Sequence, residues 1–348
     1  MKNRLCDNPD LFTIVMPIKD RPEYLKRSLD FLISQGFSGQ VVIADGSSDD
    51  MSLENKQVID NQKEIKIVYV YTAGVSKKMG WWIEMHQALK DIEYKYSLLY
   101  PDDDFFFLDE IDYCLDFLEN NKDYVSAKGR FLWIERCQYK NKDTERLRGK
   151  PNRMRFKNLP MYSFTEFADE RHIADMFNHY CHLFFSVMRS EAFLNALEQV
   201  PKYFLAAGWF DQFAFSLVCG VRGKTHTSSR LYCGRQRHLA QDSVRSAKTE
   251  PYRSWPRLLA SPDFSEHCQN FRQCLIDGFR GFVFVDDEEL KSMIDQGLVT
   301  LIKRGFGVIP FIEREEREVQ SRINDSGSLD NQRMLQVIPF LAPVPLRD

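Results

Sequence analysis

The sequence lacks a hydrophobic run long enough to cross a membrane. A spanning helix needs roughly 20 consecutive apolar residues, and the longest candidate, from Leu205 to Gly220, is interrupted by Gly208 and Asp211. The N-terminus also lacks the apolar segment of a secretory signal. We therefore expect a chain that does not span a bilayer.

The sequence also lacks a strong excess of charge and closely spaced pairs of cysteines. The formal net charge is −3, so no overall basic field favours nucleic acid, and we expect no nucleic-acid partner. The 8 cysteines are scattered along the 348 residues. Together with the missing secretory signal, this spacing predicts reduced thiols in a cytoplasmic protein.

What is present is the composition of an ordinary globular protein, with 43% hydrophobic and 28% charged residues. In the first hundred residues, short β-rich runs alternate with helical patterns. Strands are expected at 12–17, 40–44, 65–71 and 96–100, and helices from Pro22 onward, at 51–62 and at 81–90. The alternation predicts an α/β fold with a parallel sheet and helices on both faces, where ligands bind at the carboxyl ends of the strands.

The rest of the chain continues with helices and strands around one basic stretch. We expect helices at 108–119, 191–197 and 209–218, strands at 124–134, 182–188 and 225–233, and mainly helix from about 241. Residues 128–157 contain 11 Lys or Arg against 3 acidic residues. We interpret this stretch as a solvated loop, with a grip on an anionic acceptor or contact with an anionic membrane surface as alternatives.

Three consecutive aspartates, Asp102, Asp103 and Asp104, follow the predicted strand at 96–100. Adjacent carboxylates repel one another, and a hard divalent cation such as Mg²⁺ or Mn²⁺ offsets that repulsion. A solvated acidic turn or a helix N-terminus is the alternative. Their place directly after a strand of an alternating α/β unit favours the metal.

A second polar segment, residues 45–49, follows the predicted strand at 40–44. Gly46 and the two serines after it allow a tight turn, and Asp45 at the strand end could accept a hydrogen bond from a base N–H. A simple turn built of favoured turn residues is the alternative. The combination with the aspartate triplet strengthens the interpretation as a nucleotide site.

Three segments, 13–25, 41–49 and 100–104, resemble in order and spacing the inverting family 2 glycosyltransferases of GT-A fold. The resemblance covers roughly residues 11–120 well and 180–240 loosely. It implies a GT-A domain over about residues 8–240. The remainder, 241–348, would be a mainly helical region that packs on this domain or shapes the acceptor site.

The resemblance implies roles for several residues on the nucleoside side of the site. Pro17 and Asp20 or Arg21 would line the nucleoside pocket, and Asp45 would hold a uracil-like base. Lys78 matches a position that in relatives is often basic and close to the diphosphate.

The same resemblance implies that Asp103 binds the metal, with Asp102 and Asp104 placed for the ribose and for contacts around the metal. Pro101 stands where the motif usually has its first acid, so the register among the three aspartates is open. His238 matches a region that supplies some GT-A enzymes with an extra metal ligand, although a lone histidine is more often structural.

Inverting transfer needs a general base that takes the proton of the acceptor hydroxyl. Residues 208–213 resemble the family's acidic motif at a helix start, with Phe210 in place of its first acid, and Asp211 is the base candidate. A helix-capping aspartate is the alternative. Arg235, after the last predicted strand, has the guanidinium that suits diphosphate oxygens.

Together these features predict an enzyme that transfers a sugar from a UDP-like donor to a glycan or lipid-linked acceptor with inversion, assisted by Mn²⁺ or Mg²⁺. The setting implied by the resemblance is cell-surface polysaccharide synthesis. We expect a cytoplasmic location, with peripheral contact at the inner face of the membrane left open. A nucleotidyltransferase is one alternative, although residues 17–21 lack its Gly-rich loop. A degenerate binding module without turnover is the other, and the departures at Pro101 and Phe210 favour it.

Overall fold

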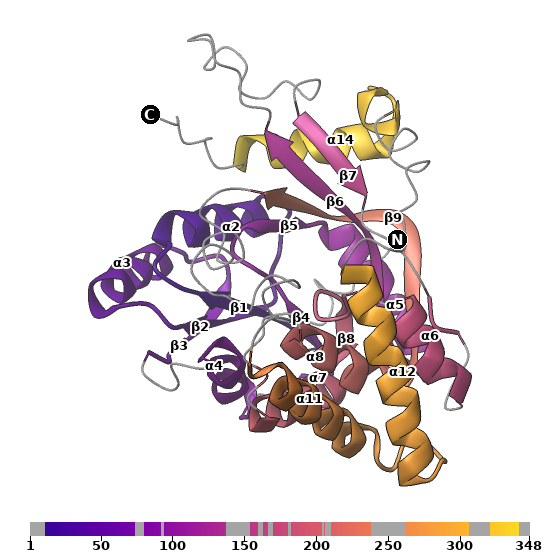
Figure 1. Cartoon of the computed structure of the whole chain (residues 1–348). Helices are drawn as coiled ribbons and strands as arrows, with labels where there is room; N and C mark the ends of the chain where they lie inside the picture. Colours follow the sequence, from indigo (N-terminus) through magenta and orange to yellow (C-terminus); the bar gives the residue numbers. More distant parts are fainter. Residues whose placement is uncertain are drawn as a thin grey trace.

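The computed structural model describes residues 11–73, 80–91, 94–136, 154–158, 163–165, 170–179, 182–203, 205, 210–237, 262–305 and 321–340. Their strands form one mixed sheet in the order β3-β2-β1-β4-β8-β6-β9-β5, with β7 paired to β6. Helices cover the sheet on both faces (Figure 1). In the described part of the chain, no helix is long and apolar enough to cross a membrane.

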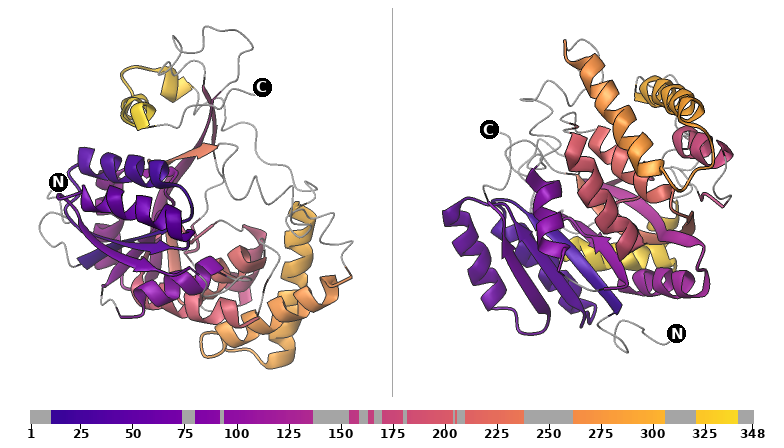
Figure 2. Two further views of the ribbon diagram at one scale, coloured as in Figure 1. Left: turned by 90° about the vertical axis from the view of Figure 1, so that its left-hand side faces the viewer. Right: turned by 90° about the horizontal axis from the view of Figure 1, so that it is seen from below.

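The first half of the sheet is parallel and follows the predicted alternation closely. Its strands are β1 (Phe12–Ile18), β2 (Gln40–Asp45), β3 (Lys66–Tyr71) and β4 (Tyr96–Leu99). Its helices are α2 (Pro22–Ser34), α3 (Asp49–Asp60) and α4 (Gly80–Leu89). β1 and β2 are buried along most of their length, as expected for strands covered on both faces. Helices α2 and α3 lie on one face and α4 on the other (Figures 1 and 2).

The second half of the sheet contains the antiparallel pairs. Its strands are β5 (Asp104–Phe106), β6 (Tyr124–Arg136), β7 (Met154–Asn158), β8 (Val187–Arg189) and β9 (Lys224–Arg237). β4 pairs antiparallel with β8, β5 with β9, and β6 with both β7 and β8, whereas β6 and β9 are parallel. Helices α5 (Leu108–Asn120), α6 (Glu170–Asn178), α7 (Ser190–Gln199) and α8 (Phe210–Gly220) accompany these strands, with the short 3-10 helix η4 (Val200–Tyr203) after α7.

Two helices from the C-terminal region complete the main core. α11 (Phe264–Phe279) contributes Phe271 and Phe279, and α12 (Asp287–Gly305) contributes Ile294, to the buried cluster that also contains the β1 and β2 side chains. α14 (Leu329–Val337) and the 3-10 helix η6 (Ile338–Phe340) pack instead on a second cluster beside β9 and β5. The predicted helical character after residue 241 is confirmed for the described part, while a domain boundary at residue 240 stays a prediction.

Arg333 joins α14 to the sheet domain through buried ionic contacts. Its guanidinium lies 2.5 Å from the carboxylate of Glu110 and 2.6 Å from that of Asp109, both on α5, and it donates to the Leu231 carbonyl at 2.5 Å. The side chain of Arg333 is 3% exposed and that of Glu110 is 0% exposed. These contacts attach the C-terminal helix to residues more than a hundred positions away in the sequence.

Three sequence predictions need correction. The strand expected at 182–188 is confined to Val187–Arg189, because residues 182–186 form a turn before the short pairing with β4. The strand expected at 225–233 extends to Arg237, because pairing with β6 continues along it. Arg235 therefore lies within a strand rather than after it.

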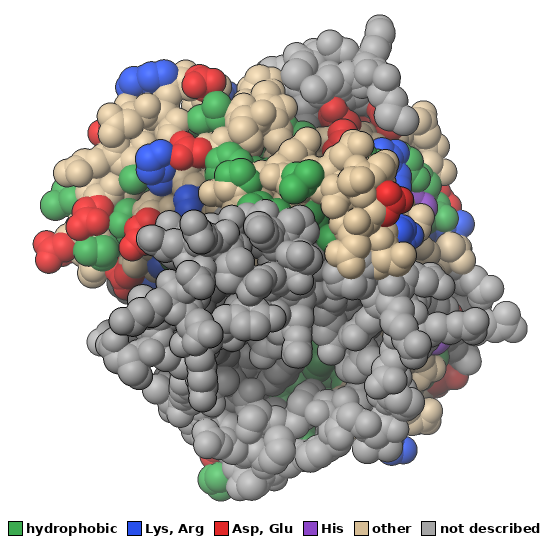
Figure 3. Space-filling model, turned by 90° about the horizontal axis from the view of Figure 1, so that it is seen from above, with side chains coloured by type: hydrophobic (Ala, Val, Ile, Leu, Met, Phe, Trp, Pro, Cys, Tyr) green, Lys and Arg blue, Asp and Glu red, His purple; other side chains and the backbone are tan. Residues whose placement is uncertain are grey.

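The third correction concerns the basic stretch at 128–157, which does not begin as a loop. Its first residues belong to β6, a strand between β8 and β9. Lys128 is buried and donates to the His182 carbonyl at 2.7 Å, and buried Arg130 forms an ion pair with Asp330 of α14. On the face shown in Figure 3, acidic and basic side chains are intermixed over the described surface.

Candidate functional site

The carboxyl ends of β1, β2 and β4 bring the predicted nucleotide-site residues to one edge of the sheet. Ile18 of β1 pairs in register with Asp45 of β2, and Val15 of β1 with Leu99 of β4. The segments that follow carry Asp20 and Arg21 after β1, Ser47 and Ser48 after β2, and the aspartate triplet after β4. This is the edge at which open α/β sheets bind ligands.

The loops after β1 and β2 are joined through Asp20. Asp20 has a positive φ of 53°, a conformation that Asp tolerates better than most residues. Its N–H donates to Ser47 Oγ at 2.7 Å, and its Oδ1 accepts from the Ser48 N–H at 2.9 Å. These two bonds hold the loops together, so the predicted nucleoside-pocket residue also has a structural role.

Asp45 ends β2 with a carboxylate that is fully buried. It accepts hydrogen bonds from the Ser47 N–H at 2.9 Å, from Asn55 Nδ2 at 3.0 Å and from the Tyr69 hydroxyl at 2.7 Å. Burial, and the hydrogen bond to Asp45, raise the pKa of Tyr69. The predicted base-binding carboxylate is therefore engaged by three donors of the protein, and sequence reasoning identified none of them as a donor to Asp45.

The aspartate triplet lies against two arginines. Arg21, at the start of α2, forms ion pairs with Asp102 and, at 3.3 Å, with Asp103 Oδ2. Arg235 of β9 lies opposite Asp104 of β5, with 2.9 Å between Nε and Oδ2. Ser28 of α2 donates to the backbone carbonyl of Asp102 at 2.6 Å. Burial raises the pKa of both Asp102 and Asp104, against the attraction of the arginines.

Exposure separates the three aspartates. The side chains of Asp102 and Asp104 are 0% exposed, whereas that of Asp103 is 7% exposed. Asp102 Oδ2 and Asp104 Oδ1 are buried and have no hydrogen-bond partner among the described residues. When all three are ionised, three carboxylates facing two guanidiniums carry one formal negative charge, which a cation would offset and whose presence would favour the ionised forms.

A divalent cation would therefore fit this site if the donor supplied most of its ligands. Within the described ranges, no three His, Cys, Asp or Glu side chains are placed to hold a metal ion by themselves. Mg²⁺ usually keeps only one or two carboxylates and takes phosphate oxygens for the rest of its shell. Asp103, as the most exposed member of the triplet, is the residue placed to contribute such a carboxylate.

Asp211, the predicted base, lies in the first turn of α8 and is buried. Trp82 of α4 donates from Nε1 to Asp211 Oδ2 at 2.9 Å, and the Trp82 ring stacks on Phe215 with centroids 5.0 Å apart. Trp82 and the residues Phe105 to Phe107 are buried in the core. The indole thus fixes the orientation of the Asp211 carboxyl.

Of the remaining predicted site residues, the structure describes Pro17. Pro17 is half-buried near the end of β1, at the same edge as Asp45. Lys78 and His238 lie outside the described residues. Sequence reasoning missed Glu84 of α4, whose carboxyl lies against Gly46 at the end of β2. The sequence signal that could have pointed to Glu84 is its place on the helix that follows a strand-to-helix connection and faces the sheet.

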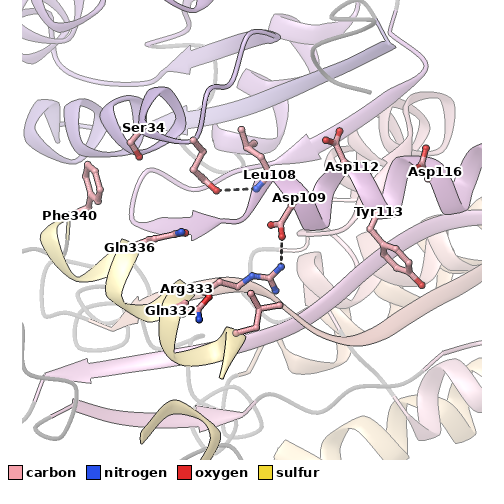
Figure 4. A pocket seen from close by; sticks show the side chains of 12 residues that line it. Ser34, Leu108, Asp109, Asp112, Tyr113, Asp116, Gln332, Arg333, Gln336 and Phe340 are labelled. Atoms are coloured by element: carbon pink, nitrogen blue, oxygen red, sulfur yellow. Dashed lines mark hydrogen bonds and ion pairs between the residues drawn. The ribbon is translucent and has the colours of Figure 1, made fainter. Parts of the chain in front are cut away.

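A cavity of about 660 Å³ lies elsewhere, between α2, α5 and α14 (Figure 4). Asp109, Asp112 and Asp116 line it from α5 and Arg333 from α14, while Ser34 lines it at the end of α2. Helix α2 begins beside the aspartate triplet and has 13 residues, so its two ends are roughly 20 Å apart. The cavity contains none of the predicted site residues.

Comparison with known proteins identifies the fold. No family model matches the sequence, and no curated protein matches it. A crystal structure of S. aureus TarS 1–349 in complex with UDP-GlcNAc has 14% sequence identity and a TM-score of 0.50, and the similarity covers 90% of this chain and 80% of that chain.

Two further TarS structures show weaker similarity, again at 14% identity. TarS 1–349 alone has a TM-score of 0.41, covering 94% of this chain and 89% of that chain. TarS 1–349 in complex with UDP has a TM-score of 0.42, covering 88% and 91%. The similarity to the UDP-GlcNAc complex, with the sheet order described above, confirms the predicted α/β fold of GT-A type.

Proposed function

We propose that this chain is a glycosyltransferase that moves a sugar from a nucleotide-diphosphate donor, UDP-like, to a glycan or lipid-linked acceptor with inversion. The observation that carries the proposal is the meeting of Asp20, Asp45 and the aspartate triplet at the carboxyl ends of three parallel strands. The shared fold with a protein that binds UDP-GlcNAc supports it.

On the donor side, two charged groups would act on the diphosphate. Arg21 and Arg235 hold their guanidiniums at the aspartate triplet, with side chains 19% and 16% exposed. A guanidinium can stabilise the charge that develops on the leaving diphosphate. Mg²⁺ or Mn²⁺ bound through Asp103 would supply Lewis-acid chemistry at the same oxygens.

On the acceptor side, Asp211 would take the proton of the attacking hydroxyl. Its Oδ2 is engaged by Trp82, which leaves the carboxyl in a fixed orientation at the start of α8. A base held in this way needs no reorganisation before proton transfer. The acceptor, the cytoplasmic location and peripheral contact with an anionic membrane stay predictions.

The test of donor binding is calorimetry with UDP, GDP and CMP, each with and without Mn²⁺. We expect Mn²⁺-dependent binding of one diphosphate by the wild type and its loss in Asp103→Ala. Asp60→Ala, which removes an exposed aspartate at the end of α3, is the matched control and should bind normally. Absence of binding for all three nucleotides would refute the proposal.

Turnover needs a separate measurement, because a degenerate module would also bind the donor. We expect Asp211→Asn to bind the diphosphate normally and to abolish release of UDP from a UDP-sugar in the presence of acceptor. If the wild type binds UDP but never releases it from a UDP-sugar with any glycan acceptor, a binding module without catalysis becomes the better description.

A further inference from the structure

The site needs a hydrogen-bond acceptor that is available to the nucleoside of the donor. Asp45 occupies the expected position, but its carboxylate is fully buried and accepts from Ser47, Asn55 and Tyr69. A nucleoside could reach it only by displacing one of these donors. Since satisfied hydrogen bonds in a buried position are costly to break, an acceptor other than Asp45 is more suitable for binding the nucleoside.

Glu84 lies beside the same turn. A Cβ atom added to Gly46 would stand 2.6 Å from Glu84 Oε2 and 2.9 Å from Oε1, so the carboxyl lies directly against the backbone that follows β2. The residue is half-buried and sits in the fields of Lys19 and Asp45. Burial raises the pKa of Glu84, and Lys19 opposes that change.

The Glu84 carboxyl makes no hydrogen bond or ion pair with any residue that the structure describes. Its neighbours on the sheet edge, by contrast, are bonded to one another, as Asp20 is to Ser48 and Asp45 to Tyr69. A partly buried carboxyl to which none of the described residues donates, at the edge where ligands bind, has acceptor oxygens suited to a ligand.

We propose that the Glu84 carboxyl accepts a hydrogen bond from the nucleoside of the donor, either from a base N–H or from a ribose O–H. This inference rests on the proposed function. Gly46 belongs to the same arrangement, because the absence of a side chain there lets the Glu84 carboxyl lie over the turn. Asp45, in this arrangement, positions the loop by holding Ser47 and Asn55.

The experiment measures UDP binding by calorimetry for the wild type, Glu84→Gln and Glu84→Ala. We expect the dissociation constant to rise about tenfold or more in each variant, the usual loss for a hydrogen bond to a carboxylate. Glu64→Gln, an exposed glutamate just before β3, is the matched control. Thermal melting would show whether each variant is folded.

Gly46→Ala gives an independent test of the same contact. The added methyl group would meet the flexible end of the Glu84 side chain, so the carboxyl can move away with little loss of stability. We expect weaker UDP binding in Gly46→Ala, and no further weakening when this change is combined with Glu84→Ala. Fully additive losses would contradict a shared contact.

Modified nucleotides distinguish the two sources of the donor hydrogen. If the base N–H is recognised, N3-methyl-UDP should bind the wild type more weakly than UDP does. The Glu84→Ala variant should then bind N3-methyl-UDP as well as the wild type binds it. If the ribose is recognised, 2′-deoxy-UDP or 3′-deoxy-UDP should behave in that way instead. Wild-type UDP binding with an unchanged dissociation constant in both Glu84 variants would overturn the inference alone, whereas no UDP binding by the wild type would overturn the proposed function as well.

Discussion

Removal of the Arg21 guanidinium should destabilise the protein through the aspartates that it contacts. Arg21 pairs with Asp102, whose side chain is 0% exposed, and with Asp103, which is 7% exposed. Arg21→Met keeps much of the aliphatic length and deletes the charge. The buried Asp102 carboxylate then loses its opposite charge while the surrounding protein still excludes water.

At a pH where Asp102 is ionised in the wild type, the free energy of unfolding should fall by about 3 kcal/mol, the low end of the range for breaking a buried ion pair by removing one partner. The low end applies because Asp102 can take up a proton, and burial already raises its pKa. A carboxyl with a raised pKa in the folded state keeps a proton that the unfolded chain releases. Removal of Arg21 raises this pKa further, so the loss in Arg21→Met relative to the wild type should grow as the pH rises through the folded-state pKa of Asp102, about 8 in the wild type, and the comparison is made above that pH.

Urea denaturation of the wild type, Arg21→Met and the double variant Arg21→Met/Asp102→Asn would measure this effect. The neutral amide at position 102 removes the uncompensated charge, so the double variant should recover most of the lost stability. Lys26→Met is the control, because the Lys26–Asp30 pair is exposed and should contribute at most about 0.5 kcal/mol.

A loss below about 1 kcal/mol in Arg21→Met would refute this account of the pair. So would a double variant no more stable than the single one, because the cost would then come from lost packing of the arginine rather than from the unpaired carboxylate.

Two further predictions concern the other buried contacts. Trp82→Phe should lower kcat with little change in KM for the UDP-sugar, since Asp211 loses its orienting donor. The control Phe215→Leu, which disturbs the packing alone, should leave kcat unchanged. An equal loss of kcat in both variants would contradict a positioning role for Trp82. Arg333→Met should lower the free energy of unfolding in urea by about 3 kcal/mol. The control Arg280→Met, at an exposed position, should change it by less than about 1 kcal/mol. Similar values for both variants would contradict a buried ionic attachment of α14.

The first half of the fold was predictable because its signals are local. Buried strands such as β2 are continuous apolar runs, and Pro22 marks the start of a helix after β1. Polar residues after the strand ends could be expected to meet, since the carboxyl ends of parallel strands share one edge of the sheet. The positions of Asp20, Asp45 and the aspartate triplet followed from that rule.

The second half was less predictable because its strands are defined by pairing. β8 has only three residues, and its extent depends on antiparallel contact with β4 and β6. β9 continues to Arg237 because β6 lies alongside it. The strand expected at 124–134 is confirmed as β6, but only the structure shows how its charged residues Lys128 and Arg130 are accommodated, through partners at His182 and Asp330.

The sequence by itself determined the alternation of strands and helices, the place of the acidic groups after the strands, and the resemblance to a GT-A glycosyltransferase. Hydrophobic periodicity and turn residues act between near neighbours in the chain, so they can be read without a structure. Only the tertiary structure decided that Arg21 meets Asp102, that Trp82 holds Asp211, and that Glu84 lies against Gly46. These contacts join residues on separate elements, and their distances depend on how the helices pack against the sheet.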